Sequence, residues 1–289
     1  MITTDLTGNI GDHITRYLIC RSVAEKNGYS WGINKIASHD YYGGKEQMDF
    51  LSIDYGEFCN TSYGELPENV INIWEEKNNH FSTHDFYYFQ PDIFDVSDNT
   101  KLIVKCCHDE RYFEKEKVKN WLKIKPEYAN IYAKTLNDYH IILDKDLCII
   151  NIRGNEYRGV PNLLLPKQYY EYAMNIMLKR NPKMRFLIIT DDVNYCHNLF
   201  YPSLSIAHFS IGIDYFILNH AQNLILSNSA FGIFPTYTNE NLGNVIAPLH
   251  WARHNLEIWA NSSIWTFGFD FVDKNGKVFL NNEISKEIK

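Results

Sequence analysis

The run Leu147-Cys-Ile-Ile-Asn-Ile152 constrains the fold of this chain of 289 residues more than any other stretch. Five of its six residues are apolar, which is typical of a strand that is covered on both faces of a parallel sheet. Neighbouring parallel strands need long crossover connections, usually helices. The run therefore predicts an α/β protein with a sheet buried between layers of helices.

The segments after this run repeat the same alternation of apolar strands and amphipathic helices. Strands are expected at residues 147–152, 186–190, 205–209, 223–226 and 244–247. Helices are expected at about Pro166–Arg180, from Asp191 through Leu199, over Asp214–Ala221, and from about Ala230. Strands that alternate with helices at this spacing indicate βαβ units and one parallel sheet.

The N-terminal half is less regular. The loop Thr7–Asp12 precedes a helix of about Ile14–Lys26, which Asn27-Gly28 closes. Further helices are expected over residues 114–122 and 126–136, and residues 35–100 predict short strands and long loops. The length suggests about two domains, and we place their boundary near residues 144–146, giving domains of residues 1–145 and 146–289.

Composition excludes several classes of partner and site. The net charge is −7 and no long basic run is present, so nucleic acid is not expected as the main partner. None of the six cysteines forms a Cys-x-x-Cys pair, which argues against a thiolate zinc site. No apolar run approaches the ~20 residues of a membrane span, and the N-terminus lacks a signal-peptide pattern. We therefore expect a cytoplasmic protein without a transmembrane segment.

Arg153 follows the first predicted strand directly. The carboxyl ends of parallel strands border the crevice in which open α/β sheets bind ligands, and a guanidinium group matches phosphate in a two-pronged geometry. Arg153 is therefore a candidate phosphate ligand. The alternative is that it only pairs with a neighbouring carboxylate such as Glu156.

The loop Gly8-Asn9-Ile10-Gly11-Asp12-His13 opens the first predicted helix. Its glycines let the backbone approach a ligand, and the helix N-terminus offers free N–H groups. It lacks the third glycine of the dinucleotide fingerprint and the Gly-Lys-Ser/Thr of a P-loop. The pattern taken alone therefore favours a glycine-rich turn without a ligand.

Polar residues also end two later strands. Asp191 and Asp192 can cap a helix, hold a metal or bind a nucleoside, and capping is the favoured interpretation because a metal needs several converging oxygen ligands. Ser227-Asn228-Ser229 can cap the next helix or hold a diphosphate. A serine nucleophile is disfavoured, because no Gly-x-Ser-x-Gly elbow surrounds these residues.

The order and spacing of these segments resemble the α-1,2-fucosyltransferases of glycosyltransferase family 11. The loop from Gly8 to His13 resembles the Gly-x-Leu-Gly-Asn-Gln loop of that family. The residues Asn151-Ile-Arg-Gly-Asn-Glu156 resemble its His-x-Arg-Arg-x-Asp motif, with the first arginine kept as Arg153. Later matches are Gln168-Tyr-Tyr170, Ile189-Thr-Asp-Asp192, Asn228-Ser-Ala-Phe231 and Val245-Ile-Ala-Pro248 with Trp251. The resemblance covers residues 5–30 and 145–255.

This resemblance implies a GT-B fold with two Rossmann-like domains facing a cleft. It implies an inverting, metal-independent transfer of L-fucose from GDP-fucose to a glycan hydroxyl, with no cofactor. Arg153 would stabilise the departing diphosphate, and His13, Asp12 and Glu156 are the candidate bases. The candidate donor-binding residues are Gly8, Asn9, Gly11, Asn151, Arg153, Asp191, Asp192, Ser227, Asn228, Ser229 and Phe231. The nucleotide would bind residues 146–289 and the acceptor mainly residues 1–145.

The chain departs from the family pattern at two motif positions. Asn151 replaces the histidine, and Gly154 replaces the second arginine. These changes leave open a transferase that uses another donor sugar. They also leave open a non-catalytic homologue that binds a nucleotide sugar or a carbohydrate. A third alternative is an unrelated doubly wound enzyme that acts on a phosphorylated metabolite.

Overall fold

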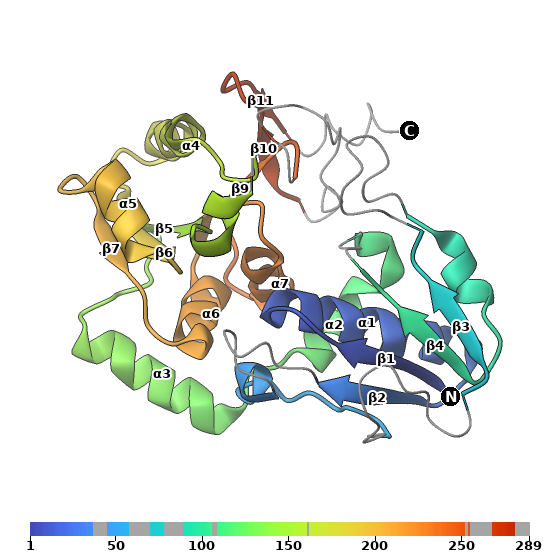
Figure 1. Cartoon of the computed structure of the whole chain (residues 1–289). Helices are drawn as coiled ribbons and strands as arrows, with labels where there is room; N and C mark the ends of the chain where they lie inside the picture. The colour runs from blue at the N-terminus through green and yellow to red at the C-terminus, as the bar shows by residue number, and fades with distance from the viewer. Residues whose placement is uncertain are drawn as a thin grey trace. The chain divides into compact units, whose positions relative to one another are not determined.

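The computed structural model describes residues 1–36, 45–57, 70–77, 89–105, 109–160, 162–251, 254 and 268–280. Contacts divide the chain into two compact units, Met1–Lys125 and Pro126–Lys289. Each unit is an α/β structure and is described by itself (Figure 1). Much of the segment predicted as short strands and long loops lies outside the described residues.

The first unit contains a parallel sheet with the strand order β2-β1-β4-β3 among its described residues. Its strands are β1 (Ile2–Leu6), β2 (Trp31–Ile36), β3 (Asn72–Glu75) and β4 (Thr100–Ile103). Its helices are α1 (Ile10–Asn27) and α2 (Lys115–Trp121), with short 3-10 turns η1 (Lys45–Met48), η2 (Pro91–Asp95) and η3 (Glu110–Tyr112). The crossover from β1 through α1 to β2 makes this unit Rossmann-like.

Helix α1 begins at Ile10, four residues before the predicted start, so the prediction of a loop through Asp12 was wrong. Asn9 caps the helix, because its side chain accepts hydrogen bonds from the backbone N–H groups of Gly11 and Asp12. The side chain of Asp12 in turn accepts a hydrogen bond from the Asn9 N–H at 3.2 Å, which completes a capping box. Gly28 ends the helix in the left-handed conformation, as Asn27-Gly28 predicted.

The second unit contains a larger sheet with the order β11-β10-β9-β8-β5-β6-β7 among its described residues. Its strands are β5 (Leu147–Ile152), β6 (Arg185–Thr190), β7 (Ser205–Ala207), β8 (Asn223–Ile225), β9 (Asn244–Pro248), β10 (Asp270–Val272) and β11 (Val278–Phe279). Its helices are α3 (Pro126–Asp138), α4 (Lys167–Arg180), α5 (Val193–Phe200), α6 (Ile211–His220) and α7 (Ala230–Thr238), with the turn η4 (Asn155–Gly159). Every strand pair is parallel except β10 with β11, which confirms the predicted βαβ units.

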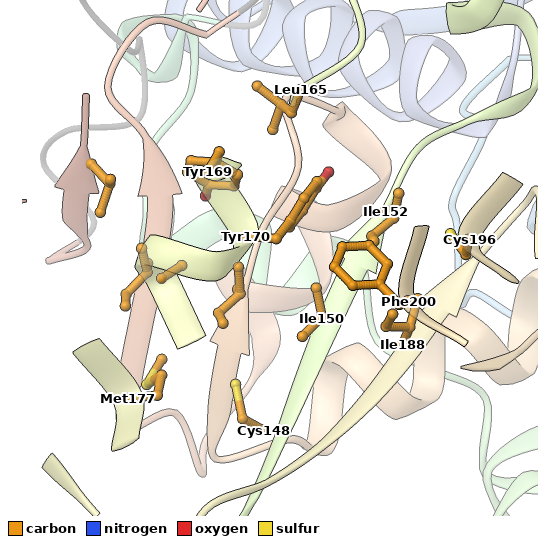
Figure 2. Close-up of a cluster of buried hydrophobic side chains, with 14 of the residues drawn as sticks. Cys148, Ile150, Ile152, Leu165, Tyr169, Tyr170, Met177, Ile188, Cys196 and Phe200 are labelled. Atoms are coloured by element: carbon orange, nitrogen blue, oxygen red, sulfur yellow. The ribbon is translucent and has the colours of Figure 1, made fainter. Parts of the chain in front are cut away.

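The core of the second unit explains why β5 is almost entirely apolar. All six residues of β5 are buried, because α4 and α5 cover one face of the sheet while α6 and α7 cover the other (Figure 1). On the α4 side, Cys148, Ile150 and Ile152 pack with Tyr169 and Tyr170 (Figure 2). The sequence at 147–152 thus places the carboxyl end of β5 in a fixed position at the edge of a packed sheet.

Two boundaries differ from the predicted ones, and two strands were not predicted. The division between the units falls before α3 rather than near residues 144–146, because Tyr132 of α3 packs edge-on against Phe216 of α6, with ring centroids 5.8 Å apart. Helix α6 begins at Ile211 rather than residue 214, because Ser210 accepts a hydrogen bond from the Ile213 N–H. Strands β10 and β11 were not predicted.

In the described part of the chain, no helix has the length and hydropathy needed to cross a bilayer.

Candidate functional site

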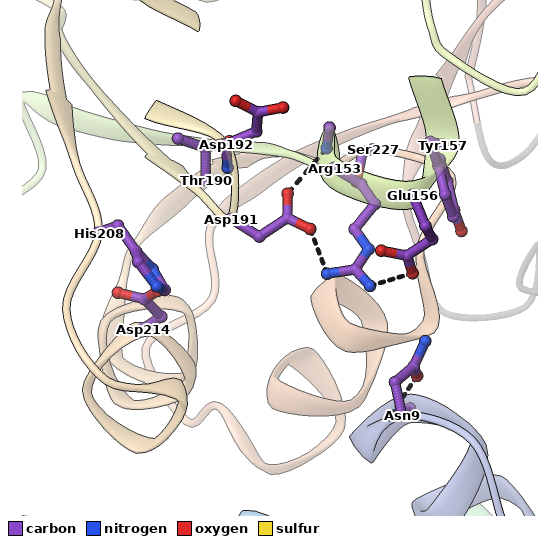
Figure 3. Close-up of polar contacts among 12 residues, drawn as sticks. Asn9, Arg153, Glu156, Tyr157, Thr190, Asp191, Asp192, His208, Asp214 and Ser227 are labelled. Carbon is purple, nitrogen blue, oxygen red and sulfur yellow. Dashed lines mark hydrogen bonds and ion pairs between the residues drawn. The ribbon is translucent and has the colours of Figure 1, made fainter. Parts of the chain in front are cut away.

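Arg153 lies directly after β5, at the carboxyl edge of the larger sheet. Its guanidinium group forms ion pairs with Glu156 of η4 and with Asp191, which follows β6 (Figure 3). The side chain is 15% exposed, so it is largely removed from water. Burial opposes its charge, but Asp191 and Glu156 outweigh this effect and raise the pKa of the guanidinium group. The site therefore keeps a permanent cation whose remaining N–H groups can bind an anion.

Gly154 brings the backbone of β5 close to the end of β6. Its N–H donates to Oδ1 of Asp191 at 2.8 Å. A Cβ added at position 154 would lie 2.5 Å from Cβ of Asp192. Position 154 therefore has no room for a side chain in this packing.

The two adjacent carboxylates after β6 have different roles. Asp192 caps α5, since its Oδ1 accepts a hydrogen bond from the Tyr195 N–H at 3.0 Å, and it pairs with Arg158 at 2.8 Å. This confirms the capping interpretation for Asp192. Asp191 instead points toward Arg153 (Figure 3). Burial raises the pKa of the Asp191 carboxyl, although Arg153 and the Gly154 N–H oppose the rise.

The turn after β8 contributes buried polar groups. Ser227 donates through Oγ to Oδ1 of Asn151 at 2.9 Å, so the two side chains satisfy each other. Asn228 donates through Nδ2 to the carbonyl oxygen of Leu163 at 2.9 Å. Ser229 occupies the N-cap position of α7, but its side chain makes no capping hydrogen bond, so of the two roles left open for Ser229 the capping role is not realised.

One aromatic residue, Tyr157, borders the same groups, and Phe231 packs elsewhere on α7. The hydroxyl of Tyr157 donates to the carbonyl oxygen of Asn228 at 3.2 Å, and the Arg153 guanidinium lies 5.8 Å from the Tyr157 ring centroid. Phe231, in the first turn of α7, packs edge-on against Tyr215 with centroids 6.1 Å apart. Arg153, Asn151, Glu156, Asp191 and Ser227 are therefore brought together at one edge of the sheet.

A histidine at this edge was missed by the sequence reasoning. His208 follows β7, and its Nδ1 lies 2.7 Å from Oδ2 of Asp214 (Figure 3). The other oxygen of Asp214 accepts the Phe209 N–H at 3.1 Å. The hydrogen bond with Asp214 raises the pKa of His208, against the opposing effect of burial. Burial also raises the pKa of Asp214 itself, which His208 opposes. The one signal for this pair in the sequence is that His208 and Asp214 lie six residues apart, on either side of the turn after a predicted strand.

The remaining predicted site residues belong to the first unit. Gly8 has φ +89°, and a Cβ there would lie 2.5 Å from Oδ2 of Asp12. Asn9 and Asp12 are engaged in the capping box, and Gly11 lies within the first turn of α1. His13 is fully buried (0% exposed), and burial together with Arg16 lowers its pKa to about 4. Its ring nitrogens have no hydrogen-bond partner among the described residues.

A metal centre has no counterpart in this arrangement. Among the residues that the structure describes, no group of three His, Cys, Asp or Glu side chains could hold a metal ion. The chemistry at the carboxyl edge is instead that of a guanidinium group surrounded by carboxylates, hydroxyls and amides. Such a set suits an oxyanion that also offers hydrogen-bonding groups.

Comparisons with known proteins identify the fold. No protein-family model matches the chain, and no curated protein matches its sequence. POFUT1 in complex with GDP is similar at 10% identity and a TM-score of 0.51, over 85% of this chain and 97% of that chain. POFUT1 in complex with GDP-fucose is similar at 9% identity and a TM-score of 0.51, over 85% of this chain and 96% of that chain. The fucosyltransferase NodZ from Bradyrhizobium matches at 11% identity and a TM-score of 0.47, over 84% of this chain and 94% of that chain. The chain thus has the α/β GT-B fold of fucosyltransferases, as predicted.

Proposed function

We propose that this chain is an inverting glycosyltransferase that transfers L-fucose from GDP-fucose to a glycan hydroxyl. The observation that carries the proposal is the charged Arg153 at the carboxyl end of β5, in a fold shared with GDP- and GDP-fucose-bound POFUT1. Membership of glycosyltransferase family 11, independence from metal and a cytoplasmic location belong to the same proposal. The motif order in the sequence supports the family assignment. The buried free thiols of Cys20, Cys148 and Cys196 suit the reducing conditions of the cytoplasm.

The proposed reaction assigns a role to each group. The acceptor oxygen attacks the anomeric carbon, the bond from that carbon to the β-phosphate oxygen breaks, and its electron pair leaves with the diphosphate. Arg153 stabilises the negative charge that accumulates there. The acceptor proton passes to a base. Asp12 is engaged in the capping box and His13 is buried, so we retain Glu156 as the candidate base.

Two of the alternatives keep the same site but change the outcome. A transferase for another donor would bind a different nucleotide sugar at Arg153. A non-catalytic homologue would bind the donor without turnover. The replacement of the motif histidine by Asn151 favours neither, because Asn151 is already hydrogen-bonded to Ser227 at 2.9 Å.

A thermal-shift panel of nucleotides and nucleotide sugars tests the proposal, since a ligand that binds only the folded state raises the melting temperature. We expect GDP and GDP-fucose to stabilise the wild type but not Arg153→Ala. Arg185→Ala is a matched control, because Arg185 pairs with Asp144 at 2.9 Å at the amino end of β6. Stabilisation by another nucleotide sugar alone would favour the alternative donor. No shift with any nucleoside diphosphate would contradict the donor site.

A further inference from the structure

The guanidinium group proposed to bind phosphate is already occupied by carboxylates. Glu156 and Asp191 both pair with Arg153, and Glu156 is the more exposed partner, because it belongs to the short turn η4 and its side chain is 35% exposed against 19% for Asp191. Asp191 is held further by the Gly154 N–H at 2.8 Å. A phosphate that approaches Arg153 therefore meets one fixed carboxylate and one that can be displaced.

The charges around Arg153 are unbalanced. Asp191, Glu156 and Tyr157 act on Arg153 directly. The other titratable and charged groups in this part of the second unit act on the neighbours of Arg153: Arg158 pairs with Asp192, and His208 after β7 and Asp214 in α6 interact with Asp191. The set contains four carboxylates and two guanidinium groups, and His208 adds a positive charge only when it is protonated.

A diphosphate bound at this edge would add negative charge to a region that is already negative. Like charges at close range disfavour each other's ionised form, so protonation of a neighbouring group offsets part of the repulsion. Asp191 is buried beside Arg153, and both His208 and Asp214 interact electrostatically with Asp191. Asp191 acts directly on Arg153, so a proton taken up at Asp191 or at the groups that interact with it reduces the negative charge that a bound phosphate meets.

We propose that a phosphate-bearing ligand binds Arg153 by replacing Glu156 on the guanidinium group, and that this binding takes up a proton at the carboxylate-rich edge. The inference rests on the proposed function and adds regulation by pH to the same site. No covalent bond changes in this step: one ion pair is exchanged for another, and the proton comes from solvent. Affinity consequently increases as the pH falls from about 8 to about 6.

Isothermal titration calorimetry tests the inference with two probes of fixed charge in this pH range. GDP-fucose carries a diphosphate diester, and inorganic sulfate has neither base nor sugar. Each is titrated at about pH 6 and about pH 8 in two buffers of different ionisation enthalpy, which reveals proton uptake. The variants are Glu156→Gln, which keeps the shape of the side chain, and the matched control Asp144→Asn, which removes the carboxylate of an arginine pair at the opposite edge.

For the wild type we expect net proton uptake and a dissociation constant several-fold lower at the acidic pH. Glu156→Gln should bind the probes about five- to tenfold more tightly at neutral pH, a change of roughly 1 kcal/mol, with a weaker pH dependence. Asp144→Asn should match the wild type. A cooperative thermal transition of Glu156→Gln without ligand shows that the variant is folded.

The possible failures are distinguishable. If GDP-fucose binds without proton uptake, and Glu156→Gln binds it no more tightly than Asp144→Asn, the inference is overturned while the proposed function stands. If GDP-fucose does not bind but sulfate binds with the expected dependence on pH and Glu156, the donor assignment fails and the exchange at Arg153 stands. If neither probe binds the wild type at either pH, both are overturned.

Discussion

A single guanidinium group buried among carboxylates can bind a phosphate only if it keeps its charge and has N–H groups that are not already engaged. Arg153 meets both conditions, because the neighbouring carboxylates raise its pKa and its ion pairs leave part of its five N–H groups available. The sequence predicted its position at a strand end but left two roles open. The structure shows the pairing with Glu156, and the phosphate role remains a proposal.

Gly154 is required by close packing rather than by an unusual backbone conformation. In Gly154→Ala, the new Cβ would lie 2.5 Å from Cβ of Asp192, so β5 and β6 must shift apart. We expect a loss of about 1–3 kcal/mol in the free energy of unfolding, measured by denaturant titration. Gly159→Ala is the control in the same turn, because nothing lies within 4 Å of its added Cβ. Equal losses in the two variants would contradict the packing argument.

The pair of His208 and Asp214 predicts a pH dependence whose sign can be worked out. The folded-state pKa of His208 is raised, so the stabilisation from this pair is fully present below the unfolded value of about 6.5. It is lost as the pH rises through the folded pKa. Because the His208 side chain is 41% exposed, we expect the pair to contribute less than about 1 kcal/mol.

Nuclear magnetic resonance titration of the His208 ring measures this effect directly. In Asp214→Asn the pKa of His208 should fall, because the carboxylate that favours the imidazolium form is gone. The stability difference between wild type and variant should shrink above about pH 7. An unchanged His208 pKa would show that Asp214 does not control its titration.

At the scale of elements, the predictions were best where burial dictates the sequence. The continuous apolar run of β5 and the helical spacing of α4 were predicted well, because a strand or helix against a core must present apolar residues there. The starts of α1 and α6 were missed because they depend on the capping side chains of Asn9 and Ser210. The short strand β10 depends on pairing with β9, more than twenty residues earlier, and β11 depends in turn on β10, so neither is encoded by its own few residues.

The capping box of α1 gives the element-scale prediction. Asn9→Ala removes the acceptor for the Gly11 and Asp12 N–H groups and should lower the free energy of unfolding by about 1 kcal/mol. Asn9→Gly should cost only a few tenths of a kcal/mol, since glycine is tolerated at N-caps. Denaturant unfolding of both variants checks this. A loss in Asn9→Ala no larger than that in Asn9→Gly would mean that the cap contributes little.

At the scale of the whole molecule, the sequence predicted two α/β units and a GT-B fold, and the comparisons show that fold. The contact division falls one helix before the boundary we expect near residues 144–146, because the aromatic packing of Tyr132 on Phe216 cannot be read from the periodicity of α3 alone. The pairing of Arg153 with Asp191 joins residues 38 positions apart and depends on the alignment of β5 with β6. Ligand specificity depends on such long-range placement, so it could be predicted only from the motif order.

The proposed transfer is tested most directly by the rate of acceptor-dependent GDP release from GDP-fucose over a panel of glycan acceptors. We expect turnover by the wild type with at least one acceptor, and a decrease of about 100-fold or more in Arg153→Ala, because a group that stabilises transition-state charge is lost. The control Arg185→Ala should retain the wild-type rate. Equal rates in Arg153→Ala and Arg185→Ala, or binding of GDP-fucose without turnover on any acceptor, would show that the protein is not a fucosyltransferase that works through Arg153.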